Sequence, residues 1–127
     1  HNVDGDSASI TMATAIISAF EGLPIDQNLA MTGSLSVRGE VLPIGGVSAK
    51  IEAAVKSGIE RVVIPRSNLQ DVLIDEKYES MVEIIAVDSL DEVLEHALVG
   101  EQEKVSLVER LAKVIDTFSA SSESTLA

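Results

Sequence analysis

Apolar and polar residues follow a helical period in some segments of the chain and a strand period in others. Between Ser7 and about Leu23, apolar residues recur three or four positions apart. This spacing predicts a helix, and its largely apolar surface predicts burial on most sides. Gly22 and Pro24 end the helix, because glycine accepts the left-handed cap conformation and proline cannot continue a helical ladder.

Strand patterns come next. Apolar and polar residues alternate within residues 28–38, which predicts one half-buried strand. A reversal at Gly39 would let residues 41–44 pair back on it. Residues 61–65 and 82–87 are rich in valine and isoleucine and predict two further strands.

Helices separate these strands. A glycine-rich turn precedes a predicted helix over residues 47–57, which Gly58 closes. Asp88 or Ser89 can cap another helix that runs to Val99. Because strands alternate with helices, the sequence predicts an α/β (α+β) fold with strands and helices in layers.

Three parts are expected along the chain. Residues 1–100 form the main unit, and since the chain starts within what reads as an active-site loop, we expect strands before His1 to complete the sheet and the substrate groove. Apolar residues at helical spacing predict an amphipathic helical extension over 101–118. The small, polar residues 119–127 predict a flexible tail.

Charge and cysteine content exclude several classes of function. The chain carries 9 Lys and Arg against 21 Asp and Glu, a net charge of −12, which repels nucleic-acid phosphates and anionic lipids. No cysteine is present, so disulfides and thiolate zinc sites are excluded. The longest apolar-rich stretch, residues 10–20, is too short to cross a bilayer.

Two turns each place a reactive side chain at the start of a helix. Ser7 follows an acidic, glycine-containing turn, and Lys50 lies in the first turn after Gly45-Gly46. A serine hydroxyl needs an adjacent base, and neither His1, at the chain start, nor His96, late in its helix, is well placed. A neutral lysine can serve, and desolvation together with the helix dipole disfavours the ammonium form of Lys50.

Three further residues are candidates for supporting roles. Asp6 either caps the helix that begins at Ser7, which we favour, or contacts Lys50. Asp4 is either a turn residue or a Lys50 partner, and Thr32 is either an ordinary strand threonine or a hydrogen-bond partner that orients Lys50. Backbone amides around Asp6 and Ser7 could supply an oxyanion site at the helix start.

The segments Asp4–Ser9, Met31–Leu35 and Leu42–Gly46, followed by Lys50, resemble in order and spacing the proteolytic domain of Lon proteases. The resemblance covers roughly Val3 to Val99. It implies an ATP-dependent serine peptidase with a Ser-Lys dyad, carried here by Ser7 and Lys50, and makes residues 1–100 the C-terminal major part of that domain.

Asp6 and Ser9 depart from the bacterial pattern, which has proline and glycine there, and resemble the archaeal-type, membrane-tethered branch. In that branch an acidic residue touches the lysine, and the matching position is Asp4. The resemblance also implies a cytoplasmic homo-hexamer that degrades unfolded or damaged proteins. It implies no metal or cofactor in this domain; ATP and Mg²⁺ would belong to an ATPase module before His1, and membrane contact to an anchor outside this chain.

Two other functions remain as alternatives. A catalytically silent Lon-like domain could serve as an assembly or binding module. A phosphoryl-transfer protein is disfavoured, because Gly45-Gly46 lacks the rest of the Gly-x-x-x-x-Gly-Lys-Ser/Thr phosphate loop.

Overall fold

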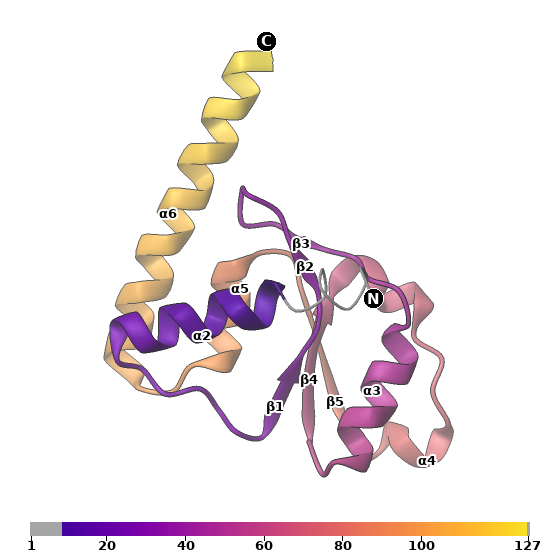
Figure 1. Ribbon diagram of the computed structural model, residues 1–127. Helices are drawn as coiled ribbons and strands as arrows, with labels where there is room; N and C mark the ends of the chain where they lie inside the picture. Colours follow the sequence, from indigo (N-terminus) through magenta and orange to yellow (C-terminus); the bar gives the residue numbers. More distant parts are fainter. Residues whose placement is uncertain (1–8, 127) are drawn as a thin grey trace.

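A three-stranded parallel sheet lies at the centre of the molecule. The computed structural model describes residues 9–126. Helices α2, α5 and α6 cover one face of the sheet, and α3 and α4 lie on the other (Figure 1). In chain order the elements are α2 (Ser9–Glu21), β1 (Leu29–Met31), β2 (Ser34–Leu35), β3 (Val41–Leu42), α3 (Val47–Lys56), β4 (Arg61–Pro65), the 3₁₀-helix η1 (Arg66–Asp71), α4 (Glu76–Glu79), β5 (Glu83–Val87), α5 (Leu90–Ala97) and α6 (Glu101–Leu126).

The strand order is β1-β4-β5, and both pairings are parallel. Ala30 pairs with Val62, and Val63 with Ile85. Because parallel strands run in the same direction, their carboxyl ends meet at one edge of the sheet. The predicted α/β class and the strands at 61–65 and 82–87 are confirmed.

Each face of the sheet is covered by its own apolar cluster. Val62 and Ile64 of β4 face α3, whereas Val63 faces the side of α2 and α5. This alternation is the two-residue period of a strand. Burial on both faces explains why β4 is a continuous apolar run rather than an alternating one.

The single strand predicted over residues 28–38 is wrong. The chain instead forms β1, in the parallel sheet, and β2, which pairs antiparallel with β3 in a separate two-stranded sheet. Gly33 separates them with a φ of 151°. A Cβ atom there would lie 3.0 Å from Val41 Cγ1 and 3.3 Å from Pro65 Cγ, so glycine lets the chain leave one sheet and enter the other. The reversal at Gly39 is confirmed, with a φ of 84°.

Helix α2 is not buried on most sides, as its sequence predicted. Met12, Ile16 and Phe20 are 60%, 64% and 87% exposed, and they lie four residues apart on one face. The opposite face packs on the core through Ile10. Part of the exposed face borders an apolar groove of about 450 Å³ between α2 and α6, the α2/α6 groove, which is lined by Ile16, Ile17, Phe20, Glu21, Leu107, Arg110, Leu111 and Val114.

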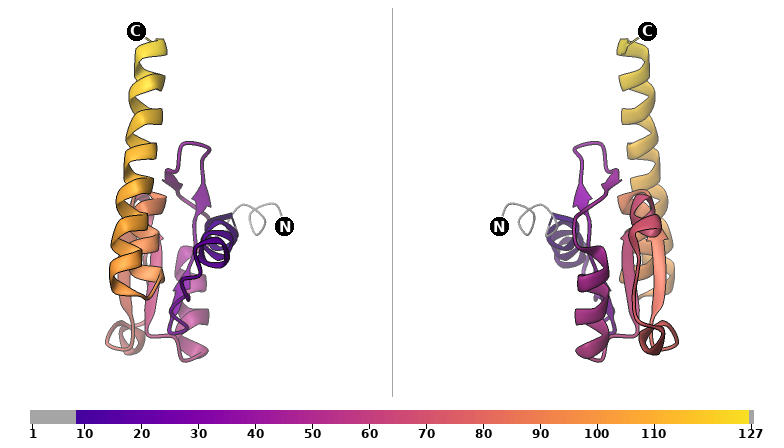
Figure 2. Two further views of the ribbon diagram at one scale, coloured as in Figure 1. Left: turned by 90° about the vertical axis from the view of Figure 1, so that its left-hand side faces the viewer. Right: turned by 90° about the vertical axis from the view of Figure 1, so that its right-hand side faces the viewer.

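Helix α6 packs against the domain at one end and projects from it at the other (Figure 2). Leu107 is buried in the core, and Arg110 donates a hydrogen bond to Glu21 of α2. The helix continues to Leu126, where the sequence predicted a tail from 119, since neither glycine nor proline follows Gly100 to break it. Among the described residues, no helix combines the length and apolarity needed to span a bilayer.

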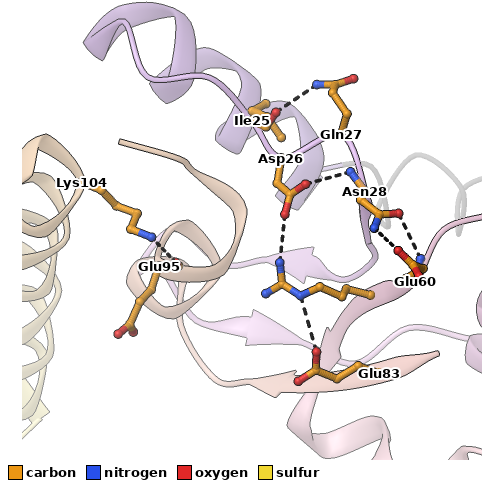
Figure 3. Close-up of polar contacts among 9 residues, drawn as sticks. Ile25, Asp26, Gln27, Asn28, Glu60, Glu83, Glu95 and Lys104 are labelled. Atoms are coloured by element: carbon orange, nitrogen blue, oxygen red, sulfur yellow. Dashed lines mark hydrogen bonds and ion pairs between the residues drawn. The ribbon is translucent and has the colours of Figure 1, made fainter. Parts of the chain in front are cut away.

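Charged side chains gather at the amino ends of the strands. Asp26 and Glu83 point toward each other in Figure 3. Arg61 bridges them, with Nη1 2.9 Å from Asp26 Oδ2 and Nε 3.6 Å from Glu83 Oε1. Asn28 and Glu60 bond each other beside this cluster. These contacts tie β1, β4 and β5 together at the edge opposite their carboxyl ends.

We predict that Gly33→Ala lowers the free energy of unfolding by about 2 kcal/mol or more, because it combines an unfavourable φ with a close contact to Val41. Urea denaturation measures the change. Gly45→Ala is the control, since nothing lies within 4 Å of its added Cβ and its φ is not positive. Equal stability of the two variants would contradict the assigned role of Gly33.

Candidate active site

Lys50 lies in the first turn of α3, where the backbone turns sharply into the helix. Gly46 adopts the left-handed conformation with a φ of 69° and precedes the first helical residue. The Lys50 amide donates a hydrogen bond to the Gly46 carbonyl at 3.1 Å. The side chain is half-buried. The predicted placement of Lys50 after a glycine turn is therefore confirmed.

A cavity of about 320 Å³ lies beside this lysine. The described residues that line it come from α2, β1 and its end, α3 and β4: Thr11, Ala30, Met31, Thr32, Lys50, Ala53 and Val62. The structure thus brings Thr32 and Lys50 into one cavity. A direct hydrogen bond between them stays a prediction.

Thr32 is held at this place by the parallel sheet. It directly follows β1, and its amide donates a hydrogen bond to the Val63 carbonyl of β4 at 3.0 Å. The residue is only 6% exposed. The cavity therefore lies at the carboxyl end of β1, the edge of a parallel sheet where ligands commonly bind.

The start of α2 borders the same cavity. Thr11, in its first turn, is a lining residue, and Ile10 beside it is fully buried. The Leu35 amide donates a hydrogen bond of 2.9 Å to Ser9 Oγ, which fixes the helix start against β2. Ser7, Asp4 and Asp6 lie outside the described residues, so their predicted roles stay predictions.

Asn68 holds the turn that leads into α3. This side chain is 1% exposed and comes from η1, directly after β4. Its Oδ1 accepts from the Ile44 amide at 2.9 Å, and its Nδ2 donates to the Ile44 carbonyl at 3.0 Å. Nδ2 also donates to Asp71 Oδ2 at 3.0 Å. All polar atoms of the Asn68 amide thus serve to fix the backbone of the loop before Lys50.

A second link fixes the first turn of α3. Ser48 Oγ donates to the Asp71 carbonyl at 3.2 Å and accepts from the Leu73 amide at 2.8 Å. No pattern in the sequence singles out Asn68 or Ser48. In the sequence each of them is typical of a turn or a helix cap. Their hydrogen-bond partners cannot be read from the sequence, because Ile44 lies 24 residues from Asn68, and Asp71 and Leu73 lie 23 and 25 residues from Ser48.

Other polar groups lie apart from this cavity. Arg66 bonds Asp88 at 2.8 Å, and that hydrogen bond raises the pKa of the Arg66 guanidinium above its ordinary value. His96 lies in the last turn of α5 and does not line the cavity. Within residues 9–126 no group of three or more His, Asp or Glu side chains could hold a metal ion.

We predict that Asn68→Ala lowers the free energy of unfolding by about 1 to 3 kcal/mol, because it removes the side-chain partners of the part-buried backbone groups of Ile44. Hydrogen exchange at the Ile44 amide should accelerate as well. Asn28→Ala, which removes an exposed asparagine bonded to Glu60, is the matched control. Unchanged hydrogen-exchange protection of the Ile44 amide in Asn68→Ala would show that Asn68 does not hold this loop.

Comparison with known proteins identifies related sequences. A family model for the Lon protease (S16) C-terminal proteolytic domain matches residues 2–100. An archaeal Lon protease of Halobacterium salinarum is 64% identical over 112 residues, which cover 88% of this chain and 16% of that protein.

Less similar relatives are also named Lon proteases. An archaeal Lon protease of Methanothermobacter thermautotrophicus is 59% identical over 90% of this chain and 18% of that protein, and a Lon protease of Azorhizobium caulinodans is 44% identical over 84% and 13%. The chain thus spans less than a fifth of the length of these curated relatives. The chain belongs to the family of Lon protease C-terminal proteolytic domains.

Proposed function

We propose that this domain hydrolyses peptide bonds with Ser7 as nucleophile and Lys50 as general base. Ser7 Oγ attacks the substrate carbonyl while the Lys50 amine takes its proton and then delivers it to the leaving amine. An acyl-enzyme forms, and water resolves it. The observation that carries the proposal is the position of Lys50, which is half-buried and lines a cavity. Thr11, in the first turn of α2, lines the same cavity and lies only four residues after Ser7.

Supporting residues would orient the dyad. Thr32, which is buried at the end of β1 and lines the same cavity, would hydrogen-bond the Lys50 amine and direct its lone pair. We assign Asp6 to capping of the helix that follows it, and Asp4 to an ion pair with Lys50 that substrate binding breaks. Backbone amides at the helix start would stabilise the oxyanion.

The complete protein that carries this domain would be an ATP-dependent protease acting on unfolded or damaged proteins. We place the binding of ATP and Mg²⁺ in an ATPase module outside this chain. Any membrane anchor would also lie outside this chain. A cytoplasmic homo-hexamer is the proposed assembly. The apolar α2/α6 groove supports a subunit contact, because apolar patches on a protein surface commonly mark interfaces.

The same groove also supports the rival function, a catalytically silent Lon-like assembly or binding module. That role needs neither Ser7 nor Lys50. The presence of both residues, together with the cavity beside Lys50, favours the enzyme. Covalent labelling of Ser7 by a serine-reactive probe separates the two functions, because a silent module would not react.

We predict that Ser7→Ala, in the full-length protein, reduces peptide cleavage by at least about 1,000-fold, because the nucleophilic oxygen is lost. Circular dichroism and the mass of the assembly should not change. The exposed Ser80→Ala serves as control. Retained turnover in purified Ser7→Ala would exclude Ser7 as the nucleophile.

Lys50→Met should lower kcat by about 100- to 10,000-fold, because it removes the base but keeps the aliphatic stem of the side chain. The rate of Ser7 acylation by the serine-reactive probe is the direct measurement. Lys56→Met, at the exposed end of the same helix, is the matched control and should react normally. If Lys50→Met acylates as fast as the parent, another group is the base.

A further inference from the structure

One buried side chain bonds the loop before α3 in the way that a neighbouring strand would. Strand β3 ends at Leu42, so Ile44 lies beyond its pairing with β2. Asn68 accepts from the Ile44 amide through Oδ1 and donates to the Ile44 carbonyl through Nδ2. This double contact is the pattern of two residues paired across adjacent strands. Of the side chains of this size, only asparagine carries both an amide donor and a carbonyl acceptor.

The same side chain is linked to the first turn of α3. Asn68 Nδ2 also donates to Asp71 Oδ2, and the Asp71 carbonyl accepts from Ser48 Oγ. Ser48 Oγ in turn accepts from the Leu73 amide. Together with the two bonds to Ile44, these contacts form one network of five hydrogen bonds, which we call the α3 brace.

The α3 brace spans the Gly45-Gly46 turn, because Ile44 precedes the turn and Ser48 follows it. Val47 and Ile51 pack α3 against the sheet. Apolar contacts have no preferred direction, so they hold the helix on the sheet but define the rotation of its first turn only loosely. Hydrogen bonds are directional, and those of the brace fix this rotation.

We propose that Asn68 and Ser48 are positioning residues of the peptidase reaction, which set the direction of the Lys50 side chain from the first turn of α3. The inference rests on the proposed function, because it needs Lys50 as the base. Lys50 reaches the cavity on a flexible four-carbon stem, so a small rotation of the turn displaces its amine. A misplacement of about 1 Å can cost about 100-fold in rate. Neither Asn68 nor Ser48 lines the cavity, so both act through Lys50.

The first test compares Asn68→Ala with the parent in the full-length protein. The variant should cleave a fluorogenic peptide with a kcat about 10- to 100-fold lower and a similar KM, because Lys50 is misdirected while the residues that bind the peptide stay in place. Val93→Ala is the control for lost stability. Val93 is fully buried on the opposite face of the sheet, so this variant should unfold at lower urea without a lower kcat. A parent-like kcat in Asn68→Ala, or an equal fall in both variants, overturns the proposal.

Ser48 supplies a second variant and a conservative rescue. Ser48→Ala removes both hydrogen bonds of a half-buried hydroxyl and should fold even if Asn68→Ala does not. Its kcat should fall, and Ser48→Thr should restore most of the loss, because threonine keeps a hydroxyl that donates and accepts. Ser67→Ala, at an exposed position of η1, is the matched control and should cleave normally. A parent-like kcat in Ser48→Ala, or no recovery in Ser48→Thr, overturns the role of Ser48.

A double variant shows whether the brace acts through Lys50, and it keeps the two proposals apart. The measurement is the rate of Ser7 acylation by a small serine-reactive probe. Asn68→Ala should slow acylation when Lys50 is present and change it little in the Lys50→Met background, because the group that it directs is gone. Equal slowing in both backgrounds overturns the positioning role alone. Parent-like acylation in Lys50→Met by itself refutes Lys50 as the base, and the proposed function fails together with this inference.

Discussion

The parallel pairing of β4 with β1 and β5 is the constraint on which the rest of the molecule depends. It sets three carboxyl ends at one edge and seals both sheet faces with apolar clusters. Thr32 follows β1 at that edge, and the loop before Lys50 is fixed by residues that follow β4. Hydrogen bonding between strands therefore brings together residues that the sequence keeps eighteen positions apart.

Fixing a lysine in the first turn of a helix requires that the preceding glycine turn be rigid. Gly45-Gly46 gives the chain freedom to turn, and that same freedom would let Lys50 move. Asn68 restricts it by bonding the Ile44 backbone before the turn, and Ser48, after the turn, bonds the backbone of Asp71 and Leu73. These residues need not touch a substrate to affect the chemistry, because the direction of the lysine depends on them.

Two hollows on the described surface differ in chemistry. The α2/α6 groove is lined mainly by large apolar side chains from two helices and suits a protein surface. The cavity beside Lys50 combines alanines with two threonines and an amine, and its lining is therefore more polar. Their different linings fit the two roles proposed for them, a subunit contact in the groove and peptide hydrolysis beside Lys50.

Local patterns determined the fold class, β4, β5 and α3, and they singled out Lys50 and Thr32, because periodicity, glycine turns and motif order are properties of neighbouring residues. They failed at Gly33, where one alternating pattern spans two sheets, and at α2, where Met12, Ile16 and Phe20 face outward. The roles of Asn68 and Ser48, and the meeting of Ala30 and Ala53 in one cavity, were decided by the tertiary structure alone. Their roles are contacts between distant segments, and a pattern in the sequence records only which side chains exist, not which of them meet.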